Sequence, residues 1–237
     1  MTGVQTCALP ICISRDQVIN ASLRVLGVIG GGDTPTPEDY DNCSQALNLY
    51  IKQLQTKGMP LWKVEDLQVP MIIGQNTYNL GPTGDVICTR PLRVVMAFIR
   101  NPQNQDTTLM VISRQEYMQQ GYKPSQGIPN QVYYDPQLNN GVLYVYDTPS
   151  ATGYTIHLQV QMPVDDILTP SQIPDFPSEW FNCLKFGLAD QLALEYGVPA
   201  QVRAELAQRA AKLEEVMTDW SQEEASTTFQ PSNRFYS

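Results

Sequence analysis

The stretch SRQEYMQQGYKPSQGIPNQVYYDPQLNNGVLYVYDTPS, residues 113–150, decides the fold of this chain. Ser113 and Glu116 form a capping box, in which each side chain bonds the free backbone N–H of the other residue, so a short helix is expected near 113–120. Gly127 and Pro129 prevent that helix from continuing. The second half predicts a β-hairpin with two tyrosine-rich strands and an Asn-Asn-Gly turn, at 131–135, 142–147 and 139–141.

Helices are expected on both sides of this stretch. From Ser14, which forms a second capping box with Gln17, apolar residues recur at helical spacing. A Gly-rich run at 30–32 separates two helices in this segment, which we expect to pack as a helical hairpin. The run has no P-loop lysine and follows a helix, so we interpret it as a linker rather than a phosphate site. Two further amphipathic helices are expected after Pro177 and Pro199.

The segments between these helices predict β-strands. Residues 67–73 and 77–80 are expected to pair as a hairpin around Gly74. Pro70 cannot donate a hydrogen bond to a neighbouring strand, so it places the first of these strands at a sheet edge.

Two stronger strands follow, with different patterns. Residues 92–99 are apolar on both faces, with Val94 and Met96 expected on the same side, so this strand should be covered on both sides, the second cover being a helix of this chain or a neighbouring subunit. Residues 154–162 alternate between apolar and polar side chains, which places His157 on the polar face.

The order of these elements predicts an α+β fold, in which N- and C-terminal helices form a bundle beside a central antiparallel β domain. We expect four parts: residues 1–13 outside the fold, as an artefact or a disordered end; a helical bundle of 14–58 and 176–225; a β domain of 59–175 with the short helix near 113–120; and an extended tail of 226–237.

The composition argues against binding to nucleic acid or to a membrane. The chain has 24 acidic and 15 basic residues, a net charge of −9 and a pI near 4.5. A protein that grips DNA carries a basic patch, and Arg90, Arg93 and Arg100 around one strand are too few to make one. An acidic surface suits a protein that DNA must pass without sticking. No run approaches the roughly 20 apolar residues of a membrane span.

The first eleven residues, MTGVQTCALPI, resemble the translation of a common sequencing-adapter oligonucleotide. The alternative is a signal peptide, but the segment lacks the positively charged start that such peptides have. The cysteines at 43, 88 and 183 have no zinc or redox spacing, which indicates synthesis in a reducing cytosol. Cys43 and Cys183 fall at apolar helix positions and are expected to pack as small hydrophobic residues.

No set of residues predicts catalysis, so we expect a protein that is not an enzyme and holds no cofactor and no metal. His157 is the only histidine, and we interpret it as a solvated surface residue. Asp165 and Asp166 lie in a Pro-rich crossing, where turn and cap roles are favoured over a carboxylate pair or a metal site. The acidic residues from Glu214 to Glu224 predict a solvated helix face, with a docking face as the alternative.

Six blocks of sequence, in this order, resemble one protein family. They are LGV at 26–28, QLQTKGMPLWKVED at 53–66, QNTYNLG at 75–81, RPLRVVMAFIR at 90–100, the stretch from 112 to 150, and FPSEWFNCLKFGLADQLALEYGVP at 176–199. Their order and spacing resemble the head-to-tail adaptors of short-tailed bacteriophages, also called tubular tail protein A.

This resemblance implies a structural virion protein, assembled in the bacterial host cytoplasm. It implies a ring of identical subunits, expected to number twelve, beneath the portal protein. Such a ring extends the DNA channel, helps to retain the packaged genome and attaches the tail nozzle protein. Double-stranded DNA would pass through the lumen without sequence-specific binding. The resemblance carries over no catalytic residues.

The tail offers the only candidate site residues. Phe229, Phe235 and Tyr236 are aromatic residues in a polar segment, and we expect them to bind the portal by ordering upon contact. The alternative function is a tail-associated carbohydrate- or receptor-binding module, which would also contain strands and many tyrosines. Such a module would rarely carry two long flanking helical segments.

Overall fold

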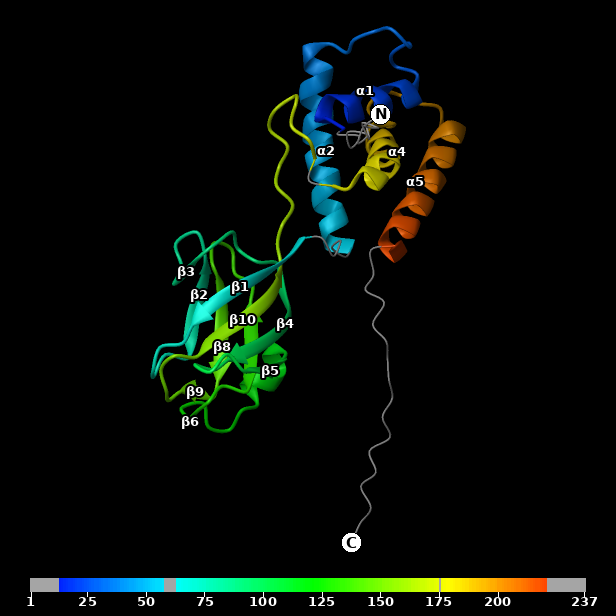
Figure 1. Cartoon of the computed structure of the whole chain (residues 1–237). Coiled ribbons are helices and arrows are strands. Elements are labelled where there is room, and N and C mark those ends of the chain that lie inside the picture. The colour runs from blue at the N-terminus through cyan, green and yellow to red at the C-terminus, as the bar shows by residue number, and fades with distance from the viewer. Residues whose placement is uncertain (1–12, 58–62, 175, 221–237) are drawn as a thin grey trace, which may run out of the picture.

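The computed structural model describes residues 13–57, 63–174 and 176–220. It confirms the predicted α+β class, because four longer helices pack together and a large, mostly antiparallel sheet lies apart from them (Figure 1). The helices are α1 (Arg15–Leu26), α2 (Pro37–Lys57), α3 (Arg114–Met118), α4 (Phe181–Leu192) and α5 (Ala200–Trp220), with a 3-10 turn at Ser178–Trp180 before α4. The described residues contain no helix long and apolar enough to cross a membrane.

The first helix, α1, begins and ends where its local signals predict. Ser14 caps α1 and forms the expected capping box with Gln17, and Gly27 ends the helix in the left-handed conformation at φ 73°. One core unites α1, α2, α4 and the crossing that precedes α4. Its fully buried members include Val18, Ile19, Leu23, Cys43, Leu47, Tyr50, Ile51, Val164, Ile167, Cys183, Leu184 and Leu188. Cys43 and Cys183 therefore pack in the core as predicted.

The β part is built on an eight-stranded sheet in the order β1-β10-β4-β5-β7-β8-β2-β3. All its pairs are antiparallel except β5–β7 and β2–β3, and a parallel pair, β6–β9, forms a second small sheet. The strands are β1 (Val64–Pro70), β2 (Thr77–Gly81), β3 (Val86–Ile87), β4 (Arg93–Arg100), β5 (Asp106–Val111), β6 (Gln126–Gly127), β7 (Gln131–Asp135), β8 (Gly141–Tyr146), β9 (Thr148–Pro149) and β10 (Thr155–Gln161). A separate core lies on this sheet, with Val69, Leu80, Leu143, Ile156 and Leu158 fully buried.

The predicted hairpin around Gly74 is wrong. β1 pairs with β10 and β2 pairs with β8, because the loop between β1 and β2, although it closes a turn from Ile72 to Gln75, is bonded to distant backbone. Gly74 N–H donates to the carbonyl of Pro149, and Val145 N–H donates to that of Asn76. The edge position of β1, predicted from Pro70, is confirmed.

The predicted facing of β4 is also wrong, because the strand contains a bulge. Val94 pairs with Val160 and Met96 pairs with Gln159, so Val95 has no partner on β10. The extra residue turns Val94 toward the core and leaves Met96 on the other face, where its side chain is 57% exposed. Around Met96, therefore, the described residues cover only one face of β4.

Residues 113–150 fold as expected. Ser113 caps α3 in a capping box, and β7 and β8 pair as an antiparallel hairpin. Gly141 is required by packing, since a Cβ there would lie 1.9 Å from the hydroxyl of Tyr134. That hydroxyl donates a 2.7 Å hydrogen bond to the carbonyl of Pro91, in the interior of the β part.

The chain segment between β10 and α4 is held against α2 by side-chain contacts. Asn48 bonds both backbone groups of Ile167, donating to its carbonyl at 3.2 Å and accepting from its N–H at 3.0 Å. Lys52 pairs with Asp166 at 2.8 Å. Figure 1 shows this extended crossing running from the sheet alongside α2. Asp166 therefore holds a linker in place, and Asp165 is exposed.

Candidate partner-binding surfaces

His157 is not the solvated residue that the alternation predicted. Its side chain lies on the outer face of β10 but is only 4% exposed. The carboxylate of Asp66 on β1 accepts a 2.9 Å hydrogen bond from its Nδ1, and the ring of Phe98 on β4 stacks on it at 4.6 Å. Neighbouring strands on both sides cover the imidazole, so β-strand period alone misjudged its burial. The arrangement is a packing contact rather than a catalytic one.

The other candidate chemical groups do not converge. Within the described residues, no group of three or more His, Cys, Asp or Glu side chains is placed to hold a metal ion. The Gly-rich run forms a loop in which Gly30 N–H donates to Asp33 at 2.9 Å. Arg100 is engaged with Asp106 through two hydrogen bonds, at 2.7 and 2.8 Å, and Arg93 donates to Gln161 at 2.6 Å.

Glu214 corrects the prediction of a uniformly solvated acidic face on α5. It accepts a 3.0 Å hydrogen bond from the hydroxyl of Tyr50 and pairs with Lys57, and its side chain is only 15% exposed. Glu215 and Asp219 are exposed as predicted, while Glu223 and Glu224 lie outside the described residues. One member of the acidic run thus joins α5 to α2, and the sequence carries no local signal that separates it from its neighbours.

The tyrosines of the central stretch pack on one another. The ring centres of Tyr117, Tyr133 and Tyr144 are 5.1 to 5.7 Å apart, between α3 and the β7–β8 hairpin. Arg114 donates to the hydroxyl of Tyr133 at 2.8 Å and pairs with Asp135 at 2.6 Å. Tyr117 and Tyr133 are each 6% exposed, so these rings stabilise the β part and do not form an open aromatic surface.

Two exposed apolar areas were not predicted from the sequence. On the outer face of the sheet, Met96 and Met110 are 57% and 65% exposed, on the paired strands β4 and β5. In the loops near β6 and β9, Ile72, Ile73 and Ile128 are each more than half exposed. Exposed apolar side chains that gather on one surface are candidates for contact with another protein.

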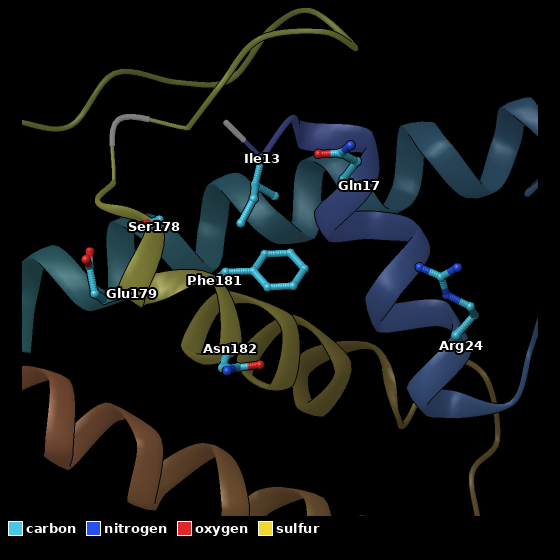
Figure 2. Close-up of a pocket in the computed structure, with 7 residues that line it drawn as sticks. All are labelled: Ile13, Gln17, Arg24, Ser178, Glu179, Phe181 and Asn182. Atoms are coloured by element: carbon cyan, nitrogen blue, oxygen red, sulfur yellow. The ribbon is translucent and has the colours of Figure 1, made fainter. Parts of the chain in front are cut away.

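A pocket of about 520 Å³ opens between α1 and the start of α4. Figure 2 shows the ring of Phe181 between the two helices, with Gln17 and Arg24 on α1 and Asn182 on α4 around it. Ile13, Ser178 and Glu179 complete the lining. The pocket therefore combines the aromatic ring of Phe181 with a mostly polar lining.

The predicted portal-binding residues, Phe229, Phe235 and Tyr236, lie outside the described residues. Their role stays a prediction.

Comparison with known proteins gives one match that spans the fold. No curated protein matches the sequence. The family model of the SU10 adaptor protein matches residues 15–234, from the first residue of α1 into the C-terminal tail. This length includes both cores and every helix and strand described above. The chain therefore belongs to the SU10 adaptor protein family and is a structural adaptor of a phage virion, of the head-to-tail kind.

Proposed function

We propose that this adaptor forms a closed ring of identical copies, twelve in number, beneath the portal of a short-tailed phage. The ring extends the DNA channel, helps to retain the packaged genome and attaches the tail nozzle. The observation that carries this proposal is the family match over nearly the whole chain, since it places an adaptor role on the complete fold rather than on one motif.

Exposed apolar side chains support the ring. Met96 and Met110 on the sheet, and Ile72, Ile73 and Ile128 in the loops, lie on the surface of a single copy. Neighbouring copies or the nozzle would remove them from water, at roughly 25 cal/mol per Å² of apolar surface. Copies that assemble gain this free energy of burial, whereas a monomer does not.

The charge supports a DNA conduit. A net charge of −9 provides no general attraction for phosphates, so double-stranded DNA can pass without sequence-specific contacts. We also propose the domain division expected from the sequence, with residues 14–58 and 176–225 as a helical domain and 59–175 as a β domain. The two separate cores support two domains, and Val164 and Ile167, near the end of the second range, pack in the helical core.

The alternative of a carbohydrate-binding module rested on the many tyrosines. Sugar recognition by aromatic residues needs open ring faces, and Tyr117 and Tyr133 are nearly buried against each other. These two rings are therefore not available to stack on a sugar.

Portal binding by the tail is tested by truncation. We expect a chain that lacks residues 229–237 to keep the thermal unfolding transition of the full chain and to lose binding to the purified portal ring, as measured by biolayer interferometry. A chain with Thr227 and Thr228 replaced by alanine is the matched control and should bind like the full chain. Undiminished binding by the truncated chain would contradict the tail's role.

A further inference from the structure

Three cations from three helices gather on one side of the helical part. They are Arg24 on α1, Lys185 on α4 and Arg209 on α5. The ammonium of Lys185 and the guanidinium of Arg209 both lie over the ring of Phe186, at 4.6 and 4.2 Å from its centre. None of the three cations forms an ion pair with any residue that the structure describes. This cation face is conspicuous in a chain whose net charge is −9.

The positions of these charges are set by the packing of the helices. The hydroxyl of Ser22 on α1 donates a 2.9 Å hydrogen bond to the backbone carbonyl of Lys185, which holds α4 against α1. Partial burial, and then the charges of Arg209 and Arg24, lower the pKa of the Lys185 ammonium. Like charges held this close repel one another, so an anionic partner would stabilise the group.

The pocket beside α1 continues the cation face. Phe181 lies one helical turn before Lys185, whose ammonium is 5.8 Å from the centre of the Phe181 ring. Arg24 belongs to both features, since it also lines the pocket. Figure 2 shows Arg24 on α1 and the ring of Phe181 in the same pocket, so positive charge lies at the rim of a pocket with an aromatic centre.

The same subunit carries a complementary surface on α2. Glu38, Asp41, Gln45 and Leu49 recur at helical spacing and are all exposed, opposite the buried stripe that contains Leu47 and Ile51. Neither carboxylate forms an ion pair within the described residues. Leu49 is 71% exposed. This acidic stripe has negative charge at one end and an apolar side chain at the other.

We propose that the acidic stripe of one copy docks on the cation face of the next, with Glu38 and Asp41 beside Arg24 and Arg209, and Leu49 at the Phe181 pocket. At 1.5 Å per residue, Asp41 and Leu49 are about 12 Å apart along α2, which is comparable to the length of α1 that lines the pocket, about 10 Å from Gln17 to Arg24. Two different complementary surfaces on one chain are what a ring of head-to-tail contacts requires. This interface rests on the ring proposed above.

Charge reversal tests the interface. We would measure assembly by sedimentation velocity and negative-stain microscopy, with and without the purified portal ring. Arg24→Glu and Asp41→Arg should each lower the apparent association constant about tenfold or more, and the two changes in one chain should restore assembly. Arg90→Glu and Glu65→Arg make the same charge changes in the β part and should assemble like the unaltered chain. Circular dichroism melts check that each variant folds.

The outcomes separate this interface from the ring itself. Salt should weaken assembly, because the screening length falls from about 10 Å at 0.1 M to about 3 Å at 1 M. If rings form and Arg24→Glu assembles as well as Arg90→Glu, the interface is wrong and the ring stands. If the unaltered chain forms no ring, either with or without the portal ring, then the proposed ring and the proposed interface are both wrong. Failure of the double variant to recover, with both single variants impaired, would also overturn the proposed pairing.

Discussion

Replacement of Gly187 by alanine should destabilise the helical part, although alanine is the better helix former. Gly187 lies inside α4, where the ring of Tyr50 from α2 packs directly on its backbone. An added Cβ would stand 2.0 Å from Cζ and 2.1 Å from the hydroxyl of Tyr50. The ring must move by roughly 1.4 Å to reach ordinary contact at 3.4 Å.

The surroundings of Tyr50 set the magnitude. Its side chain is 2% exposed, and its hydroxyl donates to Glu214 at 3.0 Å. Overpacking a core costs about 1–3 kcal/mol, and loss of a hydrogen bond to a charged group costs about 1.5–3 kcal/mol. Alanine has a higher helix propensity than glycine, which offsets this loss by about 1 kcal/mol. We expect a net loss of about 2–4 kcal/mol, and a melting temperature lower by about 4–16 °C in a chain of this size.

The assay is calorimetry together with urea denaturation of Gly187→Ala. Asn182→Ala, on the exposed side of the same helix, is the control and should change stability by less than about 0.5 kcal/mol. In a Tyr50→Leu background the clash is absent, so Gly187→Ala should then be neutral or stabilising. A Gly187→Ala chain that melts at or above the unaltered chain would refute the reasoning, as would an equal loss in both backgrounds.

Three further predictions concern single side chains. Tyr134→Phe leaves the buried carbonyl of Pro91 without its 2.7 Å donor and should cost about 1–2 kcal/mol in urea unfolding, whereas an unchanged midpoint would exclude that role. Hydrogen bonds, the largest from Thr36, hold the pKa of Asp39 below its usual value. Its contribution to stability is therefore present above about pH 4 and lost as pH falls through the lower folded pKa. Asp39→Asn should be less stable at pH 7 and show a shallower acid slope, and parallel acid slopes would contradict this. Burial raises the pKa of the Cys183 thiol to about 11, so peptide mass mapping should find it unlabelled by iodoacetamide at pH 8 in the folded protein and labelled in urea.

Local signals predicted the parts of the fold that depend on local chemistry. The capping boxes at Ser14 and Ser113 begin α1 and α3, because a cap is decided by residues within one turn. The turn at 139–141 likewise produced the β7–β8 hairpin. Pro70 marked the sheet edge, since a missing N–H cannot be supplied from elsewhere.

Features that depend on distant residues were not visible in the sequence. The loop after β1 can close a hairpin or cross to another strand, and the backbone of Pro149, far along the chain, decides between them. The bulge at Val95 arises from pairing with β10, and its effect is to place Val94 and Met96 on opposite faces of the strand. Strand period is informative only while the register is unbroken.

The candidate surfaces were predicted least well. His157 has a polar sequence context, yet Asp66 and Phe98 from two other strands bury it. The cation face needs three helices to bring its charges together, so no segment of sequence displays it. Gly187 gave no sign of its contact with Tyr50, because close approach of two helices is a property of the pair.

The most direct test of the adaptor role is electron cryomicroscopy of the purified full chain mixed with the portal ring of its phage. The account predicts a closed ring of twelve copies stacked coaxially on the portal, with a central channel wide enough for double-stranded DNA. Portal rings without added density, and adaptor chains that remain single in the same mixture, would contradict it.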